Sequence, residues 1–152
     1  MAIRKIIQIG DETLRKKSFP VNTVNEKTIQ LLDDMADTLK KAQGAGLAAV
    51  QVGVLRRTFI VDVEEGFFEF INPEIISVKG EQYGVEGCLS VKGKWGDVKR
   101  PYEVVIKALN RKGKYFTITA KGFFAKAICH EYDHLEGIVY VDKADNIRSE
   151  QQ

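Results

Sequence analysis

The two histidines of this 152-residue chain both lie in one pentapeptide, His130-Glu131-Tyr132-Asp133-His134. Residues four apart share one face of an α-helix, so a helix here would direct both imidazoles toward one metal ion. Glu131 follows His130 by about 100° around the helix, which places it near the metal without making it a ligand. A carboxylate beside a metal ion is the arrangement used in metal-assisted hydrolysis. The pentapeptide therefore predicts a helix that carries a hydrolytic metal site.

The residues around the pentapeptide favour that helix. An apolar run over 123–129 precedes it and Gly137 follows as a C-terminal stop, so we expect a helix over about residues 122–135. Two core histidines satisfied by hydrogen bonds are the alternative to a metal site, since buried polar groups need partners. We favour the metal because the helical spacing creates one inward-facing stripe, which consists of Phe123, Ala127, His130 and His134.

A catalytic metal needs a third protein ligand and an open position for water. Because the chain has no further histidine, the candidates are Cys88, Cys129 and the carboxylates. Cys129 directly precedes His130, so its sulfur would point about 100° away from the metal face, and we interpret it as a small buried apolar residue. Cys88 lies in a strand-like segment after a glycine that allows close approach of the backbone. We favour Cys88 as the ligand over inert packing.

A third segment, Gly44-Ala45-Gly46-Leu47-Ala48-Ala49-Val50-Gln51, combines early glycines with an amide side chain. Its glycines resemble a phosphate-binding loop only weakly, because no Lys-Ser/Thr pair follows and no strand precedes them. Gly44 and Gly46 instead end an amphipathic helix. A glycine segment also exposes backbone groups to a ligand, and Gln51 offers a donor of the kind that stabilises an oxyanion.

Together these three segments resemble the motifs of peptide deformylase. The family has a Gly-x-Gly-Leu-Ala-Ala-x-Gln stretch, a Glu-Gly-Cys-Leu-Ser stretch and a His-Glu-x-Asp-His helix, and this chain has them in that order at 44–51, 86–90 and 130–134. The similarity continues between them, through 71–74 and 98–101, and covers most of the chain.

The resemblance implies a role for each matching residue. Cys88, His130 and His134 would hold one divalent metal ion, Fe(II) in most members, with Zn, Ni or Co able to substitute. Glu131 would act as general base and then as general acid. Gln51 and the backbone N–H of Leu89 would stabilise the oxyanion, and Gly46 would offer a backbone contact to the formyl amide. The pocket for the methionine side chain would be formed by Ala45, Phe123 and Ala127.

Three positions depart from the family pattern. Val50 stands at the variable place of the first motif, and we expect it to matter little. Lys92 stands where many members have proline, which predicts a less rigid loop after the cysteine motif. Many members also have an arginine seven residues after the metal cysteine that contacts the peptide substrate, and this chain has Trp95 there. We therefore include Trp95 in the substrate pocket, where it would replace a charged contact to the peptide by an apolar one.

Composition agrees with a cytoplasmic enzyme. Hydrophobic residues make up 44% of the chain, and 152 residues suit a single domain over 1–152. The formal charge of +2 is too small to indicate nucleic acid as the main partner, and no apolar run is long enough to span a membrane. The N-terminal residues 1–5 lack a signal-peptide core, and two cysteines with separate roles make no disulfide framework.

Other charged residues allow two interpretations each. We interpret the basic segments, which contain Lys92, Lys94, Lys99 and Arg100 in one and Arg111, Lys112 and Lys114 in the other, as solvated loops and a hairpin turn. Because deformylases act on nascent chains, a transient ribosome contact is the alternative, without a dedicated nucleic-acid site. Asp133 either orients an imidazole or is an exposed helix charge.

The pattern of elements predicts an α+β fold, peptide deformylase-like, with small antiparallel or mixed sheets packed around a central helix that bears the His-Glu-x-x-His motif. Thr23 and Glu26 form a capping-box pattern that opens a first helix. Its buried face would hold Ile29, Leu32, Met35, Ala36 and Leu39. The expected strands are Ile6–Ile9, Thr58–Asp62, Phe67–Ile71, Ile75–Val78, and a hairpin of Tyr102–Leu109 with Tyr115–Ala120 around the turn Asn110–Lys114.

The resemblance thus predicts a hydrolase that removes the formyl group from N-formyl-methionyl peptides and nascent chains. One alternative is a metallopeptidase, because His-Glu-x-x-His occurs in many of them, but the cysteine ligand and the first motif argue against it. The other is a catalytically idle deformylase-like binding protein, which the intact metal set and Glu131 disfavour.

Overall fold

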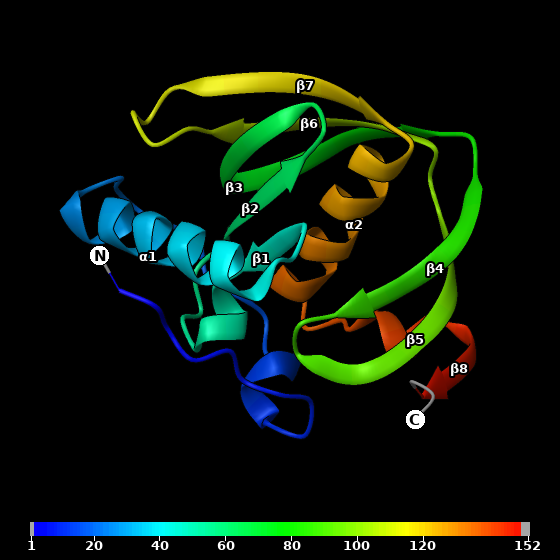
Figure 1. The fold of residues 1–152 in the computed structure, drawn as a ribbon. Helices are drawn as coiled ribbons and strands as arrows, with labels where there is room; N and C mark the ends of the chain where they lie inside the picture. The colour runs from blue at the N-terminus through cyan, green and yellow to red at the C-terminus, as the bar shows by residue number, and fades with distance from the viewer. Residues whose placement is uncertain (1, 150–152) are drawn as a thin grey trace.

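The computed structural model describes residues 2–149, which form two antiparallel sheets, two α-helices and three short 3-10 helices (Figure 1). Helix α2 (Phe123–Leu135) runs through the middle of the molecule, between the larger sheet and the ribbon of β4 and β5. Helix α1 (Glu26–Ala42) lies beside β1. The α+β class and the central motif-bearing helix agree with the sequence-based prediction.

The larger sheet has five strands, all paired antiparallel. In spatial order they are β1 (Gly46–Ala48), β2 (Thr58–Val63), β3 (Gly66–Lys79), β6 (Glu103–Leu109) and β7 (Tyr115–Lys121). The smaller sheet has three strands in the order β4 (Gln82–Cys88), β5 (Val91–Arg100) and β8 (Asp145–Ser149). The 3-10 helices are η1 (Glu12–Arg15), η2 (Ala49–Val52) and η3 (Tyr140–Asp142).

Strand β2 is covered on both faces, which explains its continuous apolar run. Phe59 and Val61 belong to the core cluster shared with α2, whereas Ile60 belongs to the cluster under α1. Successive side chains of a strand point to opposite faces, so this run contacts both helices. The edge strand β1 packs in both clusters, through Ala48 in the first and Leu47 in the second, and this fixes its position beside α2.

Helix α1 begins differently from the sequence-based prediction. Its N-cap is Asn25, whose Oδ1 accepts hydrogen bonds from the backbone N–H groups of Lys27 (3.1 Å) and Thr28 (3.2 Å). The predicted capping box of Thr23 and Glu26 is therefore wrong. Asparagine is at least as good an N-cap as threonine, and Asn25 directly precedes the first helical residue, so Asn25 rather than Thr23 caps the helix.

Helix α2 begins after Gly122, ends at Leu135 and is followed by Gly137 at φ +77°, a left-handed conformation that favours glycine. Ala127, His130 and His134 face inward as predicted. Phe123 does not, because its side chain is 56% exposed. Phe123 is the first residue of the helix and lies at the wall of a surface cavity.

Three predicted strands need correction. Residues 6–9 form no strand. The N–H of Ile7 donates to the carbonyl of Gln51, and the N–H of Ile9 donates to that of Ser90. Because these two acceptors belong to different segments, no continuous ladder of hydrogen bonds forms. The predicted strands at 67–71 and 75–78 are one strand, β3, which continues past Asn72 with a register shift. Lys92 lies inside β5, so the expected loop there is also absent.

In the part of the chain that the structure describes, none of the helices combines the length and the apolar character needed to cross a membrane.

Candidate metal centre and active site

Cys88, His130 and His134 converge at the centre of the molecule. Cys88 ends β4, and the two histidines project from one face of α2 with ring centroids 5.2 Å apart. The Cys88 Sγ lies 3.4 Å from His134 Nε2, and the ligand atoms of all three residues lie within 4.8 Å of one another. The structure therefore brings together the three predicted metal ligands, one from the smaller sheet and two from the helix.

These residues fit a metal ion in their chemistry and in the direction of their donor atoms. A sulfur and two imidazoles suit Fe, Zn, Ni or Co, and three protein donors leave a coordination position open. His134 is fully buried and turns its Nε2 toward the Cys88 sulfur, at 3.4 Å. The sulfur and the imidazole nitrogens therefore face one common position, as the donors of a single metal ion do.

Cys129 lies in a different environment from Cys88. Its side chain is 7% exposed and belongs to the apolar cluster between α2 and the larger sheet. Burial there raises the pKa of its thiol to about 11, which keeps it protonated at neutral pH. Its position agrees with the interpretation of Cys129 as a small buried apolar residue.

Glu86 is the residue that orients His130. Its Oε1 lies 2.8 Å from His130 Nδ1, which leaves Nε2 of the ring for the metal site. Arg100 binds both oxygens of the same carboxylate, with Nε–Oε2 at 2.8 Å and Nη2–Oε1 at 2.9 Å. Burial tends to raise the pKa of Glu86, but the hydrogen bonds from Arg100 and His130 outweigh it and lower the pKa to about 2. The carboxylate is therefore held ionised.

Sequence reasoning missed this role of Glu86 and misplaced Arg100. Arg100 is 3% exposed, so it is not part of a solvated basic segment. Asp133 does not contact an imidazole; it pairs with Arg100 (2.7 Å) and Lys143 (3.0 Å). The strand pattern could have identified Glu86, because residues two apart in a strand share a face and Cys88 follows at that spacing.

The other predicted basic cluster is also engaged within the fold. Arg111 forms ion pairs with Glu69 (2.6 Å) and Asp33 (2.8 Å), which tie the β6–β7 hairpin turn to β3 and α1. Lys112 and Lys114 are exposed in that turn. Lys112 and Lys114 thus agree with the interpretation as a solvated hairpin turn, whereas Arg111 is held by two carboxylates of the fold.

Glu131 lies beside the metal ligands without joining them. Its side chain is 4% exposed, and Oε1 has no hydrogen-bond partner among residues 2–149. Burial raises the pKa of this carboxyl group to about 7. The backbone of Gly46 on β1 lies against the other oxygen, Oε2.

Gln51 presents its amide nitrogen to the metal centre. The backbone N–H of Ala48 donates to Gln51 Oε1 (2.9 Å), which fixes the orientation of the amide. Gln51 Nε2 then donates to Ser90 Oγ (3.0 Å) and lies 3.6 Å from Cys88 Sγ. Ser90, which sequence reasoning left without a role, is fully buried and positions this amide.

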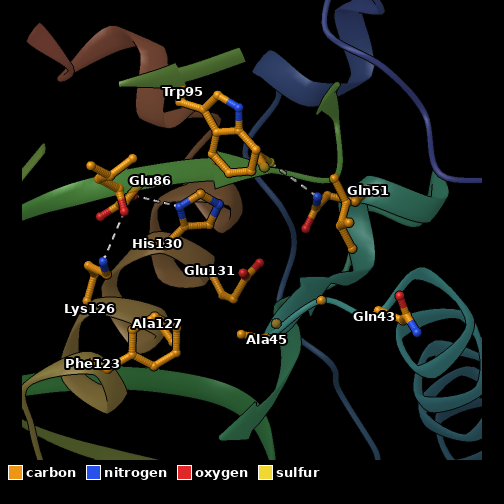
Figure 2. A pocket seen from close by; sticks show the side chains of 16 residues that line it. Gln43, Ala45, Gln51, Glu86, Trp95, Phe123, Lys126, Ala127, His130 and Glu131 are labelled. Atoms are coloured by element: carbon orange, nitrogen blue, oxygen red, sulfur yellow. Dashed lines mark hydrogen bonds and ion pairs between the residues drawn. The ribbon is translucent and has the colours of Figure 1, made fainter. Parts of the chain in front are cut away.

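A cavity of about 370 Å³ lies over the centre, within the usual size range of small-ligand sites (Figure 2). Gln43, Gly44, Val85, Glu86, Gly87 and Lys126 line it and were missed from the sequence. The predicted residues that line it are Ala45, Gly46, Gln51, Cys88, Leu89, Trp95, Phe123, Ala127, His130 and Glu131. His134 lies behind this wall, fully buried.

Trp95 forms part of the cavity wall and packs on Gly87. A Cβ atom on Gly87 would lie 2.5 Å from Cζ3 of the indole, so only glycine allows the ring to lie against β4. The Trp95 side chain is 44% exposed, and the ring points toward the cavity (Figure 2). Trp95 thus gives the cavity wall an apolar surface at the position where the resemblance led us to expect arginine.

Comparison with known proteins identifies the family. A family model described as polypeptide deformylase matches residues 3–150. A peptide deformylase of Caldicellulosiruptor bescii is 52% identical over 152 residues, which cover 100% of this chain and 92% of the relative. A crystal structure of a peptide deformylase from Legionella pneumophila superposes with a TM-score of 0.91 at 44% identity, over 95% of this chain and 87% of that one.

A crystal structure of a peptide deformylase from Synechococcus elongatus in complex with actinonin has a TM-score of 0.91 at 34% identity, over 94% of this chain and 79% of that one. The agreement extends over nearly the whole chain in sequence and in fold. On this evidence, together with the geometry of the site, the chain belongs to the polypeptide deformylase family.

Proposed function

We propose that this chain hydrolyses the N-formyl group of N-terminal formyl-methionine in newly made polypeptides and releases formate. As a member of the polypeptide deformylase family it is a hydrolase, and N-terminal deformylation of nascent polypeptides is the activity of that family. The observation that carries the proposal is the convergence of Cys88, His130 and His134 at a cavity whose wall contains Glu131.

Cys88, His130 and His134 are the protein ligands of one divalent metal ion in this proposal. Fe(II) is the expected metal, and Zn, Ni or Co are able to replace it because a thiolate and two imidazoles suit all four. A metal held here supplies Lewis-acid chemistry, since it polarises a carbonyl oxygen and makes water more acidic. Glu86 and Arg100 support the site by fixing the ring of His130.

Glu131 moves the proton. Its buried carboxylate lies beside the ligands, and Oε1 is free of partners among the described residues, so it can accept a proton from the water that attacks the formyl carbon. It then delivers this proton to the methionine nitrogen as the carbon–nitrogen bond breaks. The formic acid that results gives its proton to the new amine, so the products are formate and a peptide with a protonated α-amino group, and atoms and charge balance. General acid–base catalysis of this kind contributes about 10²–10⁴-fold.

Gln51 and the backbone N–H of Leu89 stabilise the oxyanion that forms during attack. The hydrogen bond from Ala48 holds Gln51 with its NH₂ group toward Cys88 before substrate arrives. A preorganised donor avoids the cost of reorientation in the transition state, and its removal from such a site typically costs about 10²–10³-fold in turnover. Gly46 offers its backbone to the formyl amide.

The apolar part of the cavity accepts the methionine side chain. Ala45, Phe123 and Ala127 supply small and aromatic surfaces around it, and Trp95 extends the wall toward the residues that follow. The partners are therefore N-formyl-methionyl peptides and nascent chains, and we place the enzyme in the cytoplasm, where formylated chains emerge.

One assay tests this proposal against its alternatives. The purified metal-loaded protein is incubated with a formyl-methionyl peptide, and formate release and internal peptide cleavage are measured together. We expect formate without internal cleavage. Cleavage of internal bonds would instead indicate a metallopeptidase, and peptide binding without either product would indicate an idle binding protein.

A further inference from the structure

Lys126 is a charged residue in the wall of the cavity that we propose to bind the methionine side chain. It is on α2, one turn before His130, and its Nζ donates a hydrogen bond to the carbonyl oxygen of Val85 on β4 (3.1 Å). The same ammonium lies 5.1 Å from the centroid of the Phe123 ring, a distance typical of cation–π contacts. Its position is therefore defined by contacts with β4 and with the first turn of α2.

A glycine in β4 makes this position available. A Cβ atom on Gly84 would lie only 3.3 Å from Lys126 Nζ, which is tight for any side chain. Because residue 84 has no side chain, the ammonium can lie over the backbone of the strand and reach the cavity. A Cβ atom at residue 84 would require the ammonium to shift by a few tenths of an ångström.

The ammonium group has capacity for a further partner. A lysine has three N–H donors, and among residues 2–149 Lys126 makes one hydrogen bond and no ion pair. Of the two carboxylates in the cavity wall, Glu86 is bound by Arg100 and His130, and Glu131 is buried against Gly46. Lys126 is also the one lysine or arginine among the residues that line the cavity.

We propose that Lys126 determines substrate specificity by binding a carboxylate in the residues just after the formylated methionine, so that acidic N-terminal sequences are preferred. This inference rests on the proposed function and adds a substrate class to it. Lys126 on α2 and Trp95 on β5 lie on different sides of the cavity, so the ammonium is the positive charge and the indole an apolar surface in the same cavity wall (Figure 2). A partly screened lysine–carboxylate contact predicts a preference of roughly three- to ten-fold.

The test uses formyl-Met peptides that differ only in the second or third residue, Glu, Gln or Lys, all amidated at the C-terminus. The wild type should show a kcat/KM about three- to ten-fold higher for Glu than for Gln, and the ratio should fall as salt rises. Equal values for Glu and Gln at low salt would overturn the role of Lys126 while leaving deformylation intact.

Variants separate the charge of Lys126 from its packing. Lys126→Arg should keep the preference, Lys126→Met should bring the Glu/Gln ratio to about one, and Lys126→Glu should favour the Lys peptide. Lys112→Met, on the exposed hairpin turn, is the matched control and should keep the wild-type ratio. A preference for Glu that persists in Lys126→Met would show that another residue selects the charge.

Binding gives a measurement that does not need turnover. Trp95 is the single tryptophan of the chain and lines the cavity, so its fluorescence reports occupancy by the unformylated product peptides. Tighter binding of the Glu peptide than of the Gln peptide by the wild type, but not by Lys126→Met, would support the proposal. If that result came without any formate release, the proposed function would fail while the role of Lys126 stood.

Discussion

The backbone of Gly46 lies directly against the carboxylate of Glu131, so that a Cβ atom on Gly46 would come within 2.6 Å of Oε2. The same atom would lie 2.9 Å from Cγ of the glutamate. Strand β1 therefore sets the position of the Glu131 side chain from one side, and helix α2 sets it from the other. The glycine of the first motif is required here for close approach rather than for an unusual backbone angle.

Gly46→Ala should therefore displace Glu131 while leaving the fold and the ligands in place. We expect kcat to fall by about 10- to 100-fold, because a displacement of about 1 Å can cost 10²-fold in a positioned catalytic group. Metal content and the unfolding midpoint are measured on the same sample. A variant with wild-type kcat would show that the carboxylate can shift without consequence.

The metal assignment predicts opposite outcomes for the two cysteines. Cys88→Ala removes the sulfur that lies 3.4 Å from His134 Nε2 and should abolish stable metal binding. Cys129→Ala removes a buried thiol from the apolar core and should retain about one metal ion per chain, with a modest loss of stability. Elemental analysis of both purified variants decides between them, and the reverse pattern would refute the ligand set.

The site residues whose positions follow from helix geometry or from the order of the motifs could be predicted from the sequence. His130, Glu131 and His134 follow from the geometry of one turn, and the motif order added Cys88 and Gln51. Arg100 could not be placed, because the sequence of a buried arginine looks like that of a surface one until the strand and helix that supply its carboxylates are known. Arg100 gains those partners only when β4, β5 and α2 assemble.

The strands show a similar division. The strands predicted at 58–62, 102–109 and 115–120 match β2, β6 and β7 of the larger sheet, whereas β1 was not predicted. β4 and β5 combine glycines and exposed lysines on a partly solvated ribbon, so they carry little hydrophobic pattern. Residues 6–9 had the composition of a strand, but the chain uses their N–H groups to join η2 to the turn at Ser90.

Proton transfer by Glu131 is tested by Glu131→Gln. The amide has the size of the carboxylate but cannot accept the proton, so metal content should stay near wild type while turnover falls by about 10²–10⁴-fold. Formate release from a formyl-methionyl peptide and elemental analysis are the two measurements. Near-normal turnover in a correctly loaded variant would exclude the proposed role.

The buried pair of Arg100 and Glu86 should matter for stability and for metal retention. Arg100→Met leaves the Glu86 and Asp133 carboxylates short of a buried partner, which should lower the free energy of unfolding by about 3 kcal/mol. Loss of support for His130 should also weaken metal affinity by roughly tenfold or more.

Arg56→Met is the control for Arg100, because Arg56 is exposed and its side chain, within residues 2–149, donates a hydrogen bond only to the carbonyl of Leu55. Its unfolding free energy should stay within about 0.5 kcal/mol of wild type. Denaturant titration gives the stabilities, and competition with a chelator gives the metal affinities. Equal effects of the two substitutions would mean that the buried network contributes nothing specific.

Trp95 offers the peptide an apolar face and a single N–H donor, where an arginine would offer charge. Because its ring lies on Gly87 and stays 44% exposed, Trp95→Ala should raise KM for peptides with apolar residues after methionine. Trp95→Arg should favour free-acid peptides over their amides. In both variants kcat should change less than KM, since the contact acts equally on bound substrate and transition state. Kinetics on matched free-acid and amide peptides test this, and unchanged parameters in both would reduce Trp95 to a structural residue of β5.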